Sequence, residues 1–127
     1  MSYFSIVEEL YKEHILDHAE KPRNKRVISS PAISADGENP SCGDFLTLFV
    51  LIDGGSVKDA AFTGEGCAIS QASASLLTGY LRGKTLGELR LMVPGDMYNL
   101  LKISITPSRT RCALLPYEAL ELALKKI

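Results

Sequence analysis

Apolar side chains recur at three- and four-residue intervals near the start of the chain, a spacing that places them on one face of an α-helix. The members of this series are Phe4, Val7, Leu10, Tyr11, His14, Ile15 and His18. We therefore predict an amphipathic helix from residue 4 to about residue 20, which the polar and proline-containing residues 21–24 end.

Shorter apolar runs follow this helix and alternate with turn-forming residues. Residues 27–33 predict a strand, and residues 36–41 predict an exposed loop because Asp, Gly, Asn and Pro favour turns. Residues 45–53 and 57–63 are rich in Leu, Phe, Val and Ala, and Gly54-Gly55 separates them. This pattern predicts a β-hairpin.

The second half of the chain has the pattern of several helices. Small residues at positions 68–77 predict a closely packed helix, which Gly83 ends. Thr85 and Glu88 have the spacing of a capping box for a short helix to about residue 92, and another short helix ends near Lys102. A longer, mainly apolar helix runs from Cys112 to the end.

Helices at both ends with a hairpin between them favour an α+β fold, with a small antiparallel β-sheet packed with helices. The chain has 127 residues, of which 46% are hydrophobic, so we expect a single domain spanning residues 1–127. A chain of this size can bury roughly two-thirds of its extended surface, which makes disulfides unnecessary for stability.

Charge and composition exclude several classes of function. A net charge of −1 gives no general attraction to nucleic acid or to an anionic membrane. The N-terminal residues carry charges where a secretory signal would be apolar, and the run at residues 45–52 is shorter than the roughly 20 residues of a membrane helix. In a chain without a secretory signal, the three cysteines are expected to stay reduced or to bind metal. This predicts a cytoplasmic location.

Each cysteine has a distinctive local setting. Cys42 lies in a polar loop two residues before Asp44, so a thiol and a carboxylate can approach one ion. Cys67 follows a strand and opens a helix, and Cys112 opens the last helix after two arginines. Helix N-termini and nearby cations favour the thiolate, so we expect reactive thiols at all three positions.

Three thiolates and one carboxylate form a ligand set suited to tetrahedral Zn²⁺ or to iron in an iron–sulfur cluster. Arg109 and Arg111 are candidates to lie beside these ligands and to offset their negative charge without binding the metal. Cys67 lies 25 positions after Cys42, and Cys112 lies 45 positions after Cys67, so only tertiary structure can bring them together. The alternative is that all three are small buried apolar residues.

The two histidines are a weaker candidate site. His14 and His18 have the i, i+4 spacing of a helical metal pair, but Ile15 stands where a zinc peptidase motif has its glutamate. This pair is more typical of a core or partner-facing helix surface. The short Gly64-Glu65-Gly66 segment does not have the spacing of a nucleotide-binding loop.

The segments around the three cysteines also carry a family resemblance. They are Asn39-Pro40-Ser41-Cys42-Gly43-Asp44, Gly64-Glu65-Gly66-Cys67-Ala68-Ile69-Ser70-Gln71-Ala72-Ser73-Ala74-Ser75 and Arg109-Thr110-Arg111-Cys112-Ala113-Leu114-Leu115-Pro116-Tyr117-Glu118-Ala119-Leu120. In this order they resemble the three cysteine motifs of the IscU/SufU family of iron–sulfur cluster assembly scaffolds, whose domain is the NifU N-terminal type. Residues 10–24 also resemble the first helix of that family and the loop after it.

The resemblance implies an IscU-like α+β fold in which Cys42, Asp44, Cys67 and Cys112 surround one metal or cluster site. A cysteine desulfurase would deliver persulfide sulfur there. Cys112 is the stronger candidate acceptor in the cluster-scaffold branch of the family, and Cys42 is the stronger candidate in the SufU-like branch. A transient [2Fe-2S] cluster would be assembled and passed to client apoproteins, and an iron donor is a further candidate partner. Asp44, a harder ligand than a thiolate, would leave such a site labile enough for transfer.

Features of two branches of the family occur together. Scaffold members have a histidine before the third cysteine, where this chain has Arg111. In this respect the chain resembles the SufU branch, which binds zinc and relays sulfur. However, the separation of 45 positions between Cys67 and Cys112 is too short for the insertion that SufU-like proteins carry there. A cluster scaffold, which is a carrier more than an enzyme, is the first interpretation. The alternatives are a SufU-like zinc-dependent sulfurtransferase and a structural zinc domain.

Overall fold

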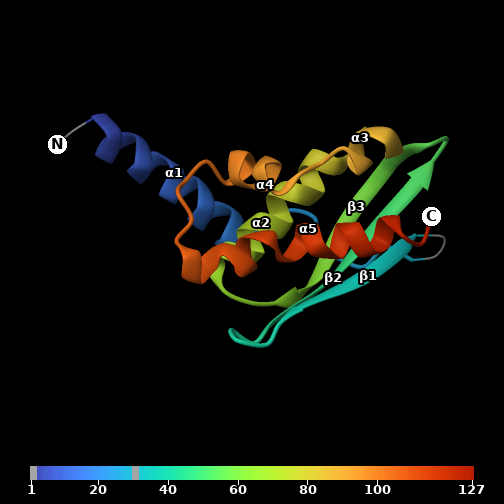
Figure 1. Ribbon diagram of the computed structural model, residues 1–127, viewed down its shortest axis with the longest axis horizontal. Coiled ribbons are helices and arrows are strands. Elements are labelled where there is room, and N and C mark those ends of the chain that lie inside the picture. The colour runs from blue at the N-terminus through green and yellow to red at the C-terminus, as the bar shows by residue number, and fades with distance from the viewer. Residues whose placement is uncertain (1–2, 30–31) are drawn as a thin grey trace.

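The computed structural model describes residues 3–29 and 32–127, with the side chains of the first helix described from Lys12 onward. It contains a three-stranded sheet and helices that lie mainly to one side of it (Figure 1). The elements in chain order are α1 (Tyr3–Glu20), β1 (Ile33–Asn39), β2 (Asp44–Asp53), β3 (Ser56–Glu65), α2 (Ala68–Leu81), α3 (Leu86–Arg90), α4 (Pro94–Leu101), the short 3₁₀ helix η1 (Pro107–Arg109) and α5 (Thr110–Leu124).

The sheet is antiparallel throughout and has the order β1-β2-β3. The predicted hairpin is confirmed, because β2 and β3 pair across the Gly54-Gly55 turn, where both glycines have positive φ angles. Side chains alternate along β2, and Leu46, Leu48 and Val50 point to the buried face. The α+β class predicted from the sequence is therefore confirmed.

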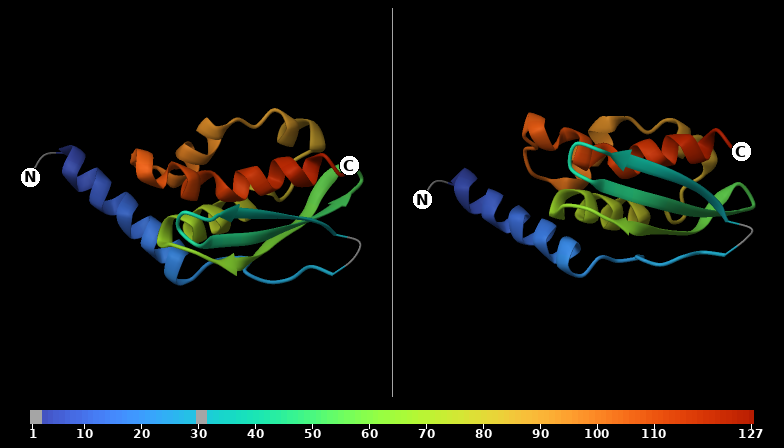
Figure 2. Two further views of the ribbon diagram at one scale, coloured as in Figure 1. Left: turned by 60° about the horizontal axis from the view of Figure 1, so that its bottom comes forward. Right: turned by 90° about the horizontal axis from the view of Figure 1, so that it is seen from below.

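The core lies between the buried face of the sheet and the helices α2 and α5. Phe62 of β3, Leu77 of α2 and Leu120 of α5 are among its fully or almost fully buried members. Helix α5 contacts β1 and β2, and α2 contacts both α5 and β3. Both views in Figure 2 show α5 crossing one face of the sheet. This layering brings the start of α5 toward one end of the sheet.

Helix α1 packs against α2 through its C-terminal half, and its N-terminal half extends away from the body of the molecule (Figures 1 and 2). The predicted helix is confirmed, but Phe4, Val7, Leu10 and Tyr11 lie outside the described side chains. After α1 the chain runs along β3, where Lys25 forms a parallel bridge with Phe62. This segment covers the outer edge of β3.

Two predictions between α1 and β2 are wrong. Residues 27–29 and 32 form no strand, and residues 30–31 lie outside the described part of the chain. Residues 36–39, predicted as a loop, belong to β1, which pairs with β2 in register from Ile33 to Asn39. The glycine at position 37 is explained by packing. A Cβ atom there would lie 3.1 Å from Leu115 Cδ1 and 3.2 Å from the Leu115 carbonyl oxygen. Glycine here allows α5 to approach the strand.

The other helices follow the sequence pattern closely. Helix α2 ends shortly before Gly83, and Thr85 and Glu88 form the predicted capping box at the start of α3. Helix α4 covers the predicted segment before Lys102, whose φ angle is positive at the helix end. Helix α5 begins at Thr110, two residues before the predicted start.

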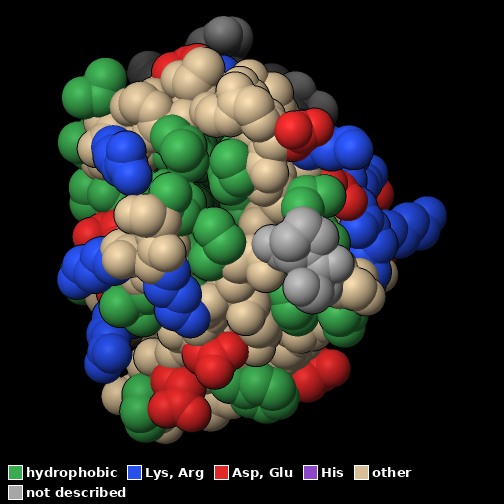
Figure 3. Space-filling view, turned by 90° about the vertical axis from the view of Figure 1, so that its right-hand side faces the viewer, with side chains coloured by type: hydrophobic (Ala, Val, Ile, Leu, Met, Phe, Trp, Pro, Cys, Tyr) green, Lys and Arg blue, Asp and Glu red, His purple; other side chains and the backbone are tan. Residues whose placement is uncertain are grey.

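The C-terminal end of the molecule has a mixed surface. Figure 3 shows hydrophobic side chains gathered on this end, with Lys and Arg on both sides and Asp and Glu close by. Positive and negative side chains are therefore interspersed on this face. In the described part of the chain, no helix is long and apolar enough to span a bilayer.

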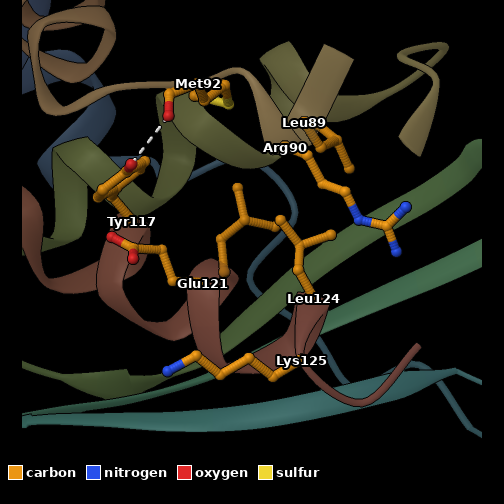
Figure 4. Close-up of a pocket in the computed structure, with 8 residues that line it drawn as sticks. Leu89, Arg90, Met92, Tyr117, Glu121, Leu124 and Lys125 are labelled. Carbon is orange, nitrogen blue, oxygen red and sulfur yellow. Dashed lines mark hydrogen bonds between the residues drawn. The ribbon is translucent and has the colours of Figure 1, made fainter. Parts of the chain in front are cut away.

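A cavity of about 190 Å³ lies between the C-terminal half of α5 and the α3 region (Figure 4). Tyr117 closes one side of it by donating a hydrogen bond of 2.9 Å to the Met92 carbonyl oxygen. Burial, followed by the nearby Glu121 carboxylate, raises the pKa of Tyr117 above its usual value. The lining residues include none of the predicted site residues, so this cavity is separate from the thiols.

Candidate metal and sulfur site

The turn between β1 and β2 carries Cys42 and ends at Asp44. The Cys42 backbone N–H donates to the Asn39 carbonyl oxygen at 3.1 Å, and Gly43 adopts a positive φ that returns the chain to β2. Cys42 is exposed on this turn. Asp44 is the first residue of β2, and its side chain faces the buried side of the sheet, where the residue is only 3% exposed.

Cys67 lies where β3 gives way to α2, at the position immediately before the helix. Its backbone N–H donates to Asp44 Oδ1 at 3.0 Å, and its Sγ lies 3.7 Å from Asp44 Oδ2. Gly66 leaves room for this contact, because a Cβ atom there would lie 2.9 Å from Asp44 Oδ1 and 2.3 Å from Ser70 Oγ. The carboxylate of Asp44 therefore links the first two cysteine segments.

Cys112 comes from the first turn of α5 and is fully buried. Its Sγ lies 3.8 Å from Cys42 Sγ. The side-chain amide of Asn39 approaches from the last residue of β1, and its Nδ2 donates to Cys112 Sγ at 3.6 Å. Three segments that are distant in the sequence thus meet at one end of the sheet, beside the starts of α2 and α5 (Figure 1).

The ligand atoms of Cys42, Asp44 and Cys112 all lie within 4.8 Å of one another. Cys67 lies just outside this group and touches it through the Asp44 carboxylate. Two thiolates on one tetrahedral Zn²⁺, with Zn–S bonds of about 2.3 Å, are about 3.8 Å apart. The separation of 3.8 Å between Cys42 and Cys112 Sγ matches this value, so the donor set fits a soft metal ion.

Burial decides the charge state of the innermost thiol in the metal-free protein. It raises the pKa of Cys112 to about 12, with smaller contributions from hydrogen bonding to Asp44, Cys67 and Cys42. The expectation of three reactive thiols is therefore wrong for Cys112, because desolvation of its buried sulfur outweighs the helix N-terminus and the arginines. A bound metal cation would reverse this balance, because a coordinating thiol is deprotonated.

The two arginines predicted near the site differ in position. The pKa of the exposed Arg109 is raised, first by its hydrogen bond with Cys112 and then by the charges of the cysteines. The charge of Arg109 therefore interacts with the thiols. Arg111 is also exposed, and among the described residues no hydrogen bond or ion pair joins it to the group. A role for Arg111 beside the site stays a prediction.

The histidine pair lies at the contact between α1 and α2. The rings of His14 and His18 are edge to face with centroids 4.8 Å apart, and His18 Nδ1 lies 2.7 Å from Ser75 Oγ. Burial, followed by the charge of Arg23, lowers the pKa of His18. This geometry agrees with a role in helix packing.

Asn39 is the site residue to which the sequence assigned no role. Its residue type gives no local signal of a contact with sulfur, although it stands three positions before Cys42. Its contact with Cys112 depends on two facts of tertiary structure, which are its pairing with Asp44 across the β1–β2 ladder and the docking of α5 on β1.

Comparisons with known proteins identify relatives of this chain. The chain is 37% identical to the zinc-dependent sulfurtransferase SufU of Bacillus subtilis (strain 168), an alignment that covers 99% of this chain and 97% of the relative. It is 33% identical to the iron-sulfur cluster assembly scaffold protein IscU of Thermotoga maritima, over 96% of this chain and 97% of the relative.

A solved structure is also similar. It is the crystal structure of a candidate iron-sulfur cluster assembly scaffold protein for the SUF system from Fervidobacterium islandicum AW-1. It superposes with a TM-score of 0.78 and 32% sequence identity, and the match covers 92% of this chain and 98% of that chain. The family described as the NifU-like N terminal domain matches residues 10–127. The chain therefore belongs to the NifU-like N-terminal domain family, which confirms the resemblance seen in its cysteine motifs.

Proposed function

We propose that this protein is a scaffold for iron–sulfur cluster assembly. It accepts sulfur from a cysteine desulfurase, and a [2Fe-2S] cluster is assembled among its thiols as cargo and passed to client apoproteins. The observation that carries this proposal is the convergence of Cys42, Asp44 and Cys112 within 4.8 Å, with Cys67 against Asp44. Relatives that are named as scaffolds and as a sulfurtransferase support the same role.

Exposure favours Cys42 as the first sulfur acceptor. The Cys42 thiolate attacks the outer sulfur of the desulfurase persulfide, a new S–S bond forms, and the desulfurase cysteine leaves as a thiolate. Cys42 is exposed on its turn, whereas Cys112 is fully buried. Cys112 is the other candidate acceptor, and its Sγ lies 3.8 Å from Cys42 Sγ.

A zinc-dependent sulfurtransferase is the second candidate function. The relative with that name is 37% identical, and Arg111, which precedes Cys112, has no side-chain atom suited to bind a metal ion. The proposed zinc ligands are Cys42, Asp44, Cys67 and Cys112. Bound zinc would hold these thiols as thiolates and order the β1–β2 turn.

A purely structural zinc site is less well supported by the packing. The main hydrophobic core is formed by side chains of the sheet and of helices α2 to α5, and it includes none of the cysteines. Reduced thiols at a sulfur-accepting site fit a reducing compartment, so a cytoplasmic location stays a prediction. The desulfurase, the client apoproteins and an iron donor are proposed partners.

Mass spectrometry after incubation with a cysteine desulfurase and cysteine tests the sulfur-accepting role. We expect an adduct of about 32 Da, one sulfur atom, which dithiothreitol removes. Cys42→Ala should abolish most of this adduct, while the matched variant Ser41→Ala, on the same turn, should retain it. A wild-type protein that binds zinc, accepts no sulfur and unfolds when zinc is removed would contradict the proposal and support a structural site.

A further inference from the structure

The side chain of Asn39 is unusual for a residue at the end of a strand. The residue is only 2% exposed and is the partner of Asp44 in the last pair of the β1–β2 ladder. Its amide points toward the thiols, where Nδ2 donates to Cys112 Sγ at 3.6 Å. Asn39 and Asp44 therefore present one amide and one carboxylate to the same thiol group.

The other polar atom of this amide is unsatisfied. Asn39 Oδ1 is buried and accepts no hydrogen bond from the described part of the protein. A buried carbonyl oxygen without a donor lowers stability, and an apolar side chain of the same shape avoids that cost. The contribution of Asn39 to folding alone therefore does not account for an amide at this position.

The Asn39 amide is better suited to the thiolate form of Cys112 than to the neutral thiol. The Nδ2 group can only donate a hydrogen bond, and a sulfur with negative charge is a much better acceptor than a neutral thiol. Cys112 carries that charge when it coordinates a metal ion or a cluster. The neighbouring Arg109 is exposed, whereas Asn39 is a buried donor to this sulfur.

We propose that Asn39 is a positioning residue that holds the Cys112 thiolate in the metal-loaded or cluster-loaded site. The inference rests on the proposed function and extends it. Cys112 would be the anchored ligand, fixed by α5 and by the Asn39 amide, whereas Cys42 lies on an exposed turn and is free to leave and take up sulfur.

Asn39→Leu tests this role because leucine keeps the shape of the side chain and removes both polar atoms. A hydrogen bond to a metal-bound thiolate lowers the energy of the sulfur lone pairs. Its loss should therefore shift the sulfur-to-cobalt charge-transfer band of the Co²⁺ form to longer wavelength. We also expect Co²⁺ affinity to fall about tenfold or more, as for other groups that orient metal ligands.

The metal-free variant should be as stable as the wild type or more stable, because the unsatisfied Oδ1 is gone. Thr47→Val is the matched control, since it removes a hydrogen bond from Thr47 to Asp36 across the same two strands without touching the thiols. The control should leave the band and the affinity unchanged. A variant Asn39→Leu with the wild-type band and affinity would overturn the proposal.

A second measurement uses the wild-type protein and does not depend on the folding of a variant. Loading with ¹¹³Cd²⁺ allows NMR detection of a scalar coupling between the metal and a proton that is hydrogen-bonded to its sulfur ligand. We expect such a coupling to one Nδ2 proton of Asn39. Its absence, with cadmium bound to all three cysteines, would contradict the role of Asn39 and leave the proposed function intact. Failure of the wild type to bind Co²⁺ or Cd²⁺ through these thiols would contradict the proposed function itself.

Discussion

The Asp44 carboxylate holds the candidate site together at the scale of single residues. It is almost fully buried, its Oδ1 accepts the Cys67 backbone N–H, and its Oδ2 lies beside Cys67 Sγ. A buried carboxylate needs such partners because desolvation of its charge is costly. Asp44 therefore fixes the start of α2 relative to β2, and its carboxylate could also bind a metal ion.

Gly66→Ala should disturb this arrangement. The added methyl group would lie 2.3 Å from Ser70 Oγ and 2.9 Å from Asp44 Oδ1, so the carboxylate must move away from Cys67. We expect the affinity for Co²⁺, measured by competition with a chelator, to fall about tenfold. Gly79→Ala on α2 is the control, because its added methyl group meets no atom within 4 Å apart from its chain neighbours and the backbone of its own helix. Equal affinities for the two variants would contradict this role of Asp44.

Residue type alone identified the candidate ligands but not their arrangement. The sequence showed three thiols and one carboxylate in polar or helix-start settings, and the family resemblance placed them around one site. The separation of Cys42 and Cys112 and the contact of the Asn39 amide with Cys112 depend on the docking of α5, which no local pattern records.

At the scale of elements, β1 shows where sequence patterns mislead. Its residues from Asp36 to Asn39 favour turns, and strand formation depends on pairing with β2 and packing against α5. By contrast, the hairpin of β2 and β3 and the capping box of α3 are encoded by residues close together in the sequence. These local elements were predicted, whereas β1 required contacts between distant segments.

Gly37→Ala tests the contact between β1 and α5. The new methyl group would lie 3.1 Å from Leu115 Cδ1 and 3.2 Å from the Leu115 carbonyl oxygen, and the backbone atom cannot move without shifting the helix. We expect the free energy of unfolding, measured in urea, to fall by about 1–3 kcal/mol. Gly87→Ala in α3, where the nearest atom is 3.8 Å away, should not destabilise the protein. An unchanged stability of Gly37→Ala would show that α5 does not approach β1 this closely.

At the scale of the whole molecule, an ion cluster joins three parts of the chain that are distant in sequence. Asp59 of β3 accepts hydrogen bonds from Arg26, before β1, at 2.7 Å, and from Arg82, after α2, at 2.8 Å. The hydrogen bond from Arg26 is the largest cause that lowers the pKa of Asp59 to about 2, and the bond from Arg82 adds to it. The cluster therefore ties the segment after α1 to the sheet and to the end of α2.

This cluster predicts how stability depends on pH. The folded-state pKa of Asp59 lies below the unfolded value, so its contribution is present above about pH 4 and is lost as the pH falls toward 2. Because Asp59 is partly exposed, we expect a contribution of about 1–2 kcal/mol. Urea unfolding of wild type and Asp59→Asn should show a difference at about pH 6 that narrows toward pH 2.5. A difference that is constant over this range would contradict the assignment.

The central claim is that three thiols far apart in the sequence form one metal-binding site. A titration of the reduced, metal-free protein with Co²⁺ tests it most directly, with Cys42→Ala, Cys67→Ala and Cys112→Ala measured alongside the wild type. The structure predicts an intense thiolate-to-cobalt charge-transfer band that saturates at one metal ion per chain and that each substitution weakens. No band, or a band that Cys42→Ala leaves unchanged, would contradict the claim.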